Sequence, residues 1–171
     1  LLVVPATSPI RNVAELVKAL REKGEAMNYA SSGSGSGGHL AGEMLAFMLG
    51  VKATHVPYKG TGPALQDLLG GQVDLTFGTA PPFMAHNQAG KLKVLAVTGK
   101  ERLPSLPKVP TTAETGFAGV NATSWFALFA PAKTPKDIVR KLETDVRNML
   151  SDASFQKKAL DQGATADFMD S

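Results

Sequence analysis

The sequence predicts an α/β fold in which a mostly parallel sheet is flanked by helices. Three observations support this prediction. Short apolar segments alternate along the chain with segments whose apolar residues recur at the helical period. Glycine or proline stands at most of the junctions between them. The strand at residues 92–97 is almost entirely apolar, as expected for a parallel strand covered on both faces.

The individual elements follow from local signals. Residues 1–4 form a short aliphatic strand that ends at Pro5. Asn12 and Glu15 have the spacing of an N-cap and its N3 partner, which predicts a helix that continues to about Lys23. The remaining expected elements are strands at 27–31, 54–57, 73–77, 92–98 and 124–130, and helices at 38–49, 63–70, 83–88, 111–115, 135–150 and 153–162.

Two of these helices have a distinct apolar face that we expect to pack inward. In the helix at 38–49, the face consists of Leu40, Met44, Leu45 and Met48. In the long helix that Pro135 opens, it consists of Ile138, Val139, Leu142, Val146, Met149 and Leu150.

Composition excludes several classes of protein. With 43% hydrophobic and 19% charged residues, the 171-residue chain has the usage of an ordinary globular protein. It contains no cysteine, so disulfides, thiolate metal sites and cysteine catalysis are excluded. The net charge of +3 is spread along the sequence and does not indicate nucleic-acid binding. No apolar run reaches the roughly 20 residues that a membrane span requires.

A Gly/Ser loop at residues 31–38 lies between a predicted strand and a predicted helix. Its glycines match G-x-G-x-x-G, and such a loop lets backbone amides approach an anion at a helix N-terminus. A dinucleotide site would also need an acidic residue at the end of the next strand, where the chain instead has Pro57-Tyr58-Lys59. Because a basic residue suits a ribose phosphate, an NADP-binding enzyme remains an alternative. A Walker loop is excluded by His39-Leu40.

The serines of this loop distinguish it from a cofactor-binding turn and make it a small polar cup. Their hydroxyl groups can donate to ligand oxygens directly or through water, although a simple turn that caps the next helix is the structural alternative. Three loops should meet at the carboxyl ends of the strands, at residues 31–38, 58–62 and 78–82. The candidate ligand-binding residues are Ser31, Ser32, Gly33, Ser34, Gly35, Ser36, His39, Tyr58, Gly78 and Thr79.

Neither catalysis nor metal binding is indicated. No nucleophile is paired with a base in a local motif, and the acidic residues look like helix, strand-end or surface positions. His55 is expected in the core and His86 on a helix surface, and together with His39 they have no metal-ligand spacing. We therefore expect no metal, no cofactor and no enzymatic activity.

Seven short motifs follow one another along nearly the whole chain. They are Asn28-Tyr29-Ala30-Ser31-Ser32-Gly33 with Gly35-Ser36, His39-Leu40-Ala41-Gly42-Glu43, His55-Val56-Pro57-Tyr58-Lys59-Gly60, Leu68-Leu69-Gly70-Gly71-Gln72-Val73-Asp74, Ala89-Gly90-Lys91-Leu92 with Leu95-Ala96-Val97-Thr98, Val109-Pro110-Thr111 with Glu114, and Ser124-Trp125-Phe126 with Ala130-Pro131. In this order they resemble the tripartite tricarboxylate transporter receptor family, also called Bug-type solute-binding proteins.

The resemblance implies a two-lobed Venus-flytrap fold of the type II periplasmic-binding-protein kind, with one complete lobe and part of the other. Residues 6–120 would form the second lobe, which carries the Gly/Ser loop. Residues 1–5 and 121–171 would be crossover strands and part of the first lobe. The family's N-terminal lobe segment and signal peptide would lie before Leu1.

The same resemblance implies a periplasmic, monomeric receptor. Its ligand would be a small carboxylate, and its partners would be inner-membrane transporter subunits. The Gly/Ser loop would be one half of a carboxylate clamp, while Gly78 and Thr79 would contact the distal end of the ligand. A ligand-sensing module of a signalling system is a further alternative, because fold does not determine function.

Overall fold

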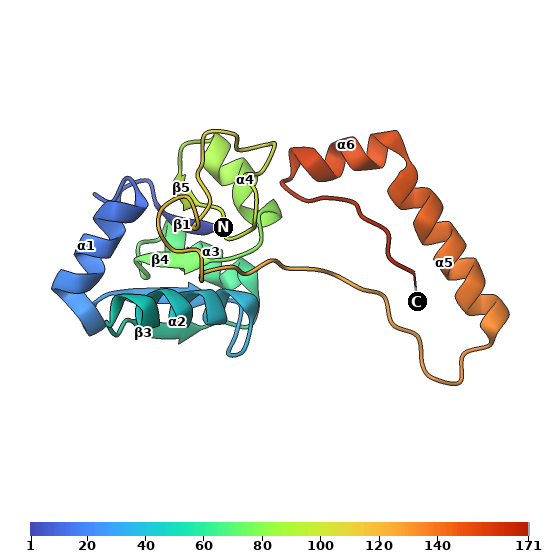
Figure 1. The fold of residues 1–171 in the computed structure, drawn as a ribbon, viewed down its shortest axis with the longest axis horizontal. Helices are drawn as coiled ribbons and strands as arrows, with labels where there is room; N and C mark the ends of the chain where they lie inside the picture. Colours follow the sequence, from blue (N-terminus) through green and yellow to red (C-terminus); the bar gives the residue numbers. More distant parts are fainter. Residues whose placement is uncertain (171) are drawn as a thin grey trace. The chain divides into compact units, whose positions relative to one another are not determined.

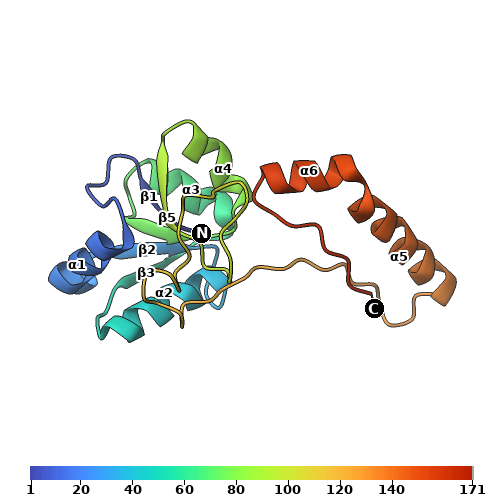
Figure 2. The same ribbon diagram turned by 45° about the horizontal axis from the view of Figure 1, so that its top comes forward.

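The computed structural model describes residues 1–170 and divides the chain into two compact units. The first unit comprises residues 1–124, and the second begins at Trp125. The first unit contains all of the strands and four of the α-helices described, and the second contains two α-helices (Figures 1 and 2).

The sheet of the first unit has the strand order β3-β2-β4-β1-β5. Strand β2 pairs parallel with β3 and β4, whereas β1 pairs antiparallel with β4 and β5. Four strands therefore share one direction, and β1 runs against them. The strands are β1 (Leu2–Pro5), β2 (Asn28–Ser31), β3 (Thr54–Pro57), β4 (Leu75–Phe77) and β5 (Leu92–Ala96). This confirms the predicted α/β fold with a mostly parallel sheet flanked by helices.

The helices of the first unit begin close to the predicted positions. They are α1 (Val13–Lys23), a short 3₁₀ helix η1 (Gly24–Ala26), α2 (Gly37–Leu49), α3 (Thr61–Leu69) and α4 (Pro81–Gln88). Helix α1 starts as the cap spacing predicts, because Asn12 Oδ1 accepts a hydrogen bond of 2.8 Å from the amide of Glu15. The Glu15 carboxylate in turn accepts a 2.7 Å bond from the amide of Arg11.

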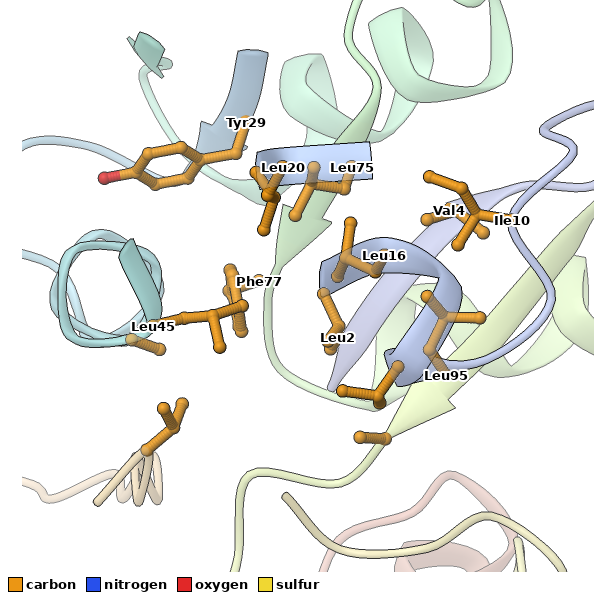
Figure 3. Packing of buried hydrophobic residues seen from close by; sticks show 14 of the residues in the cluster. Leu2, Val4, Ile10, Leu16, Leu20, Tyr29, Leu45, Leu75, Phe77 and Leu95 are labelled. Carbon is orange, nitrogen blue, oxygen red and sulfur yellow. The ribbon is translucent and has the colours of Figure 1, made fainter. Parts of the chain in front are cut away.

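Two hydrophobic clusters cover the opposite faces of the sheet. Successive residues of β1 alternate between them, since Leu2 and Val4 belong to one cluster and Val3 belongs to the other. The first cluster packs α1 and α2 against the sheet and includes Tyr29 (Figure 3). The second packs α3 and α4 against the other face. Helices therefore cover both sides of the sheet.

The predicted inward face of α2 is wrong, except at Leu45. Leu45 is buried, but the other three predicted positions, Leu40, Met44 and Met48, are 39–54% exposed. The helix packs on the sheet through Ala41, Gly42, Leu45 and Ala46 instead. The reason is the close approach of β2, because a Cβ at Gly42 would lie only 2.2 Å from the Tyr29 ring. Apart from Leu45, small residues rather than large apolar ones therefore face the sheet.

The predicted helix at residues 111–115 is also wrong. The chain forms turns there, and Thr111 makes an isolated parallel bridge to Val97 after β5. Side chains fix these turns: Glu114 accepts from the amide of Thr111 at 2.7 Å, and Thr112 Oγ1 donates to the carbonyl of Val120 at 2.6 Å. These bonds give the backbone an alternative to helical pairing.

In the second unit, α5 (Lys136–Ser151) and α6 (Ala153–Asp161) lie where the sequence predicts helices. The predicted strand at 124–130 is absent, because over residues 125–170 no neighbouring strand supplies hydrogen-bond partners. Trp125 and Phe126 are exposed. The face of α5 that was predicted to point inward is not buried either. Over residues 125–170, every side chain is at least partly accessible to solvent. Two helices alone do not enclose a core.

No helix in the part of the chain that the structure describes has both the length and the apolar character to cross a membrane.

Candidate functional site

A small hollow of about 50 Å³ lies at the carboxyl ends of β2, β4 and β5, entirely within the first unit. Residues that follow these strands line it, together with the first residues of α2 and α3. This is the position at which open α/β sheets bind ligands. The lining residues are Ser32, Gly37, Gly38, Ala41, Thr61, Phe77, Gly78, Thr79, Thr98, Ala122 and Ser124.

The lining offers hydrogen-bond donors without any charged side chain. Five lining residues carry hydroxyl groups, of which the Thr98 hydroxyl donates to the carbonyl of Ala122 at 2.8 Å. Gly37 and Gly38 are the first two residues of α2, and their amides have no acceptor within the helix. Thr61 likewise opens α3. Two helix N-termini therefore direct their positive ends toward a space that suits a carboxylate group or a few water molecules.

The Gly/Ser loop has a fixed backbone shape. Gly33 and Gly35 adopt φ values of 143° and 79°, in the region that side-chain-bearing residues rarely occupy. The Ser36 amide donates to the carbonyl of Gly33 at 3.1 Å, and Ser36 Oγ caps α2 by accepting from the amide of His39 at 3.3 Å. Ser34 and Gly35 are exposed at the tip of the loop. The loop is thus both a helix cap and an exposed edge beside the hollow.

Ser31 and Ser32, although adjacent, point to different places. Ser32 lines the hollow, whereas Ser31 is fully buried. The Ser31 hydroxyl lies 2.7 Å from His55 Nε2, donates to the carbonyl of Gly33 at 3.0 Å and accepts from the amide of the same residue at 3.2 Å. Ser31 therefore supports the loop from inside the protein.

Tyr58 has its hydroxyl group engaged on α3. The phenol donates a 2.6 Å hydrogen bond to Asp67 Oδ2, and this bond, followed by burial, raises the pKa of Tyr58 to about 12. The Tyr58 amide donates to the carbonyl of Ser31, and the Gly60 amide donates to the carbonyl of Ser32, both at 3.0 Å. The loop after β3 is therefore tied to the Gly/Ser loop through the backbone.

The structure brings part of the predicted set together at the hollow. Ser32, Gly78 and Thr79 line it, and the residues from Gly33 to Ser36 form the loop beside it. The side chain of His39 turns back and accepts from the Gly35 amide through Nδ1 at 3.0 Å. Binding by the predicted residues stays a prediction.

Eight lining residues are outside the predicted set of ligand-binding residues, namely Gly37, Gly38, Ala41, Thr61, Phe77, Thr98, Ala122 and Ser124. Gly37, Gly38 and Thr61 lie within two of the loops that the sequence places at the carboxyl ends of the strands, and Thr98 directly follows β5, so their position along the chain is a usable signal. Ser124 carries no such local signal. Over residues 1–170, no group of three or more His, Asp or Glu side chains is arranged to hold a metal ion.

Solved structures with this fold are periplasmic binding proteins. The periplasmic binding protein BugD is 36% identical to this chain with a TM-score of 0.90, over 96% of this chain and 55% of BugD. Rpa4515 from R. palustris, solved with adipate, is 40% identical with a TM-score of 0.93 and the same coverage. MatC (Rpa3494) from Rhodopseudomonas palustris, with bound malate, is 34% identical with a TM-score of 0.89, over 97% and 56%. By fold, the chain therefore corresponds to about half of a periplasmic binding protein.

Comparison of sequences assigns the chain to a particular family within this class. The chain belongs to the tripartite tricarboxylate transporter receptor (TctC) family, which matches residues 1–171. A curated relative from Pseudomonas sp. strain P51, a UPF0065 protein in the tcbD-tcbE intergenic region, is 38% identical over 151 residues, or 88% of this chain and 45% of the relative. The chain thus spans about half the length of its relatives. The resemblance expected from the motifs is confirmed.

Proposed function

We propose that this chain supplies one side of the ligand site of a periplasmic receptor that captures a small carboxylate for a tripartite tricarboxylate-type transporter. The observation that carries the proposal is the hollow lined by hydroxyl groups and two helix N-termini, with no charged side chain. Family membership and the adipate and malate in related structures support the ligand class.

The donors of the hollow suit a carboxylate better than an uncharged solute. The amides of Gly37 and Gly38 lie at the positive end of the α2 dipole, where an anion is stabilised by about 0.3–1 kcal/mol at an exposed site. The hydroxyl groups of Thr61 and Thr79 add neutral hydrogen-bond donors, which do not select for the charge of the ligand. Recognition would thus depend on the carboxylate group more than on the rest of the ligand.

Calorimetry of the full-length protein with mono-, di- and tricarboxylates tests the ligand class. We expect a small dicarboxylate to bind and its diamide analogue not to bind, because the diamide has no negative charge for the helix termini. NADPH should give no heat of binding. Tight binding of an uncharged solute, with no response to any carboxylate, would overturn the proposal.

Two substitutions in the Gly/Ser loop test the site. Ser34→Ala removes one exposed hydroxyl and should weaken binding modestly, while Gly35→Val should weaken it more, because a φ of 79° strains a β-branched residue by about 1–2 kcal/mol. Gly90→Val is the matched control. Gly90 has a φ of 68° and equally open surroundings, but it precedes β5 at the opposite end of the sheet. If Gly90→Val lowered affinity as much as Gly35→Val, the loop would have no special role.

A further inference from the structure

Three aromatic rings are stacked behind the Gly/Ser loop. His55 of β3 lies in the middle, with its ring centroid 4.0 Å from that of His39 of α2 and 4.9 Å from that of Tyr29 of β2. The ring planes are inclined by 21° and 28°, so both pairs are close to parallel. Each ring comes from a different element, and the loop connects two of these elements.

Both histidines of the stack hold the loop by hydrogen bonds. His39 Nδ1 accepts the amide proton of Gly35 at 3.0 Å. His55 Nε2 lies 2.7 Å from Ser31 Oγ, which in turn bonds the amide and the carbonyl of Gly33. The two loop glycines with positive φ are therefore the two that the stack fixes, Gly35 directly and Gly33 through Ser31.

The bond from Gly35 defines the protonation state of His39. A ring nitrogen that accepts a hydrogen bond carries no proton, so Nδ1 is bare and the neutral ring carries its proton on Nε2. Nε2 lies 4.0 Å from Glu43 Oε1, and the same carboxylate oxygen accepts a 2.6 Å bond from the Tyr29 hydroxyl.

The titratable groups around His39 are Glu43 on its own helix, His55 on β3 and Tyr29 on β2. Burial lowers the pKa of His55, and the neighbouring His39 lowers it further. Burial and the bond to Glu43 raise the pKa of Tyr29. His55 and Tyr29 therefore stay neutral near pH 7.

We propose that His39 is a positioning residue whose neutral ring holds the Gly/Ser loop in its ligand-binding shape, and that protonation of His39 releases the loop. A proton on Nδ1 would face the Gly35 N–H, so donor would meet donor and the bond would break. The release of the loop does not depend on the proposed function. The resulting loss of affinity for a carboxylate rests on that function.

Two variants of His39 separate the acceptor from the ring. His39→Asn removes the ring but keeps a neutral hydrogen-bond acceptor, the side-chain carbonyl oxygen. His39→Phe keeps a ring that can stack but has no hydrogen-bond acceptor. The measurement is the exchange protection of the Gly35 amide in the full-length protein, followed by NMR. We expect His39→Phe to lower this protection about fivefold, as for one lost hydrogen bond, and His39→Asn to retain most of it.

The pH profile gives a second readout that needs no variant. In the wild type, Gly35 protection should fall together with the titration of the His39 ring resonances in the same spectra. His39→Asn should lack this acid step. Gly35 protection that ignores the His39 titration, or that survives in a folded His39→Phe variant, would overturn the proposal.

Calorimetry with adipate separates this inference from the proposed function. If no carboxylate bound the wild type, the function would fail while the Gly35 measurement could still succeed. If adipate bound the wild type and His39→Phe equally well despite the loss of Gly35 protection, the positioning role in binding would be refuted.

Discussion

Replacing Gly38 by alanine should destabilise the first unit, whereas the same change at the neighbouring Gly37 should not. A Cβ at residue 38 would lie 2.4 Å from the carbonyl oxygen of Phe77, but a Cβ at residue 37 would meet nothing closer than Ser124 Oγ, at 3.9 Å. Real Cβ atoms do not approach other atoms within 3.0 Å, so the Gly38→Ala variant must move α2 from β4 by at least about 0.6 Å.

The magnitude follows from two opposing effects. Alanine in place of glycine favours a helix by up to about 1 kcal/mol, and at Gly37 nothing opposes this gain. At Gly38 the forced displacement costs about 1–3 kcal/mol, as for other overpacked sites. Urea denaturation of both variants should place the midpoint of Gly38→Ala clearly below that of Gly37→Ala, with similar slopes. Equal midpoints would refute the close packing of α2 on β4.

Two further predictions concern the packing of α2 and an ion pair beyond β5. Leu45→Ala should lower the free energy of unfolding by about 2–5 kcal/mol, and Met44→Ala by under about 1 kcal/mol, because only Leu45 is buried; equal losses in urea denaturation would contradict this. The hydrogen bonds from Arg102 lower the pKa of Glu114 to about 2, so its contribution to stability is complete above about pH 4.5 and is lost as the pH falls toward 2. Arg102→Met should raise that pKa toward 4.5 in a carboxyl NMR titration, and an unchanged value would contradict the pairing.

Local signals predicted most of the elements of the first unit. The Asn12 cap and the apolar periods fixed the helices to within a few residues, because these features act over one or two turns. The antiparallel place of β1 between β4 and β5 had no such signal. It depends on pairing partners more than 70 residues away, as in the register between Val3 and Thr76.

The errors have two physical causes. The large apolar residues of α2 predict the wrong buried face, because a helix that touches a sheet closely must present small residues such as Gly42. The segment 124–130 has the composition of a buried strand, yet a strand forms only when neighbours complete its hydrogen bonds. The composition of a segment shows that it could form a buried strand. Neighbouring strands determine whether that strand forms.

The site was predictable in position more than in detail. The rule that ligands bind at the carboxyl ends of parallel strands located the hollow, and Ser32 and Thr79 line it. The side chains of Ser31 and Ser32 point in opposite directions, as successive side chains of a strand do. The sequence does not show which serine points into the hollow, because a segment of Gly and Ser alone does not mark the end of the strand. The hydrogen bond from Gly35 to His39 depends on the folded loop and could not be predicted.

The most direct test of the proposed carboxylate site is an NMR titration of the full-length protein with adipate, followed on backbone amides. The account predicts saturable shifts at Gly37, Gly38 and Thr79, and none at Gly90 at the other end of the sheet. Saturable adipate binding that leaves the Gly37 and Gly38 amides unchanged would contradict it.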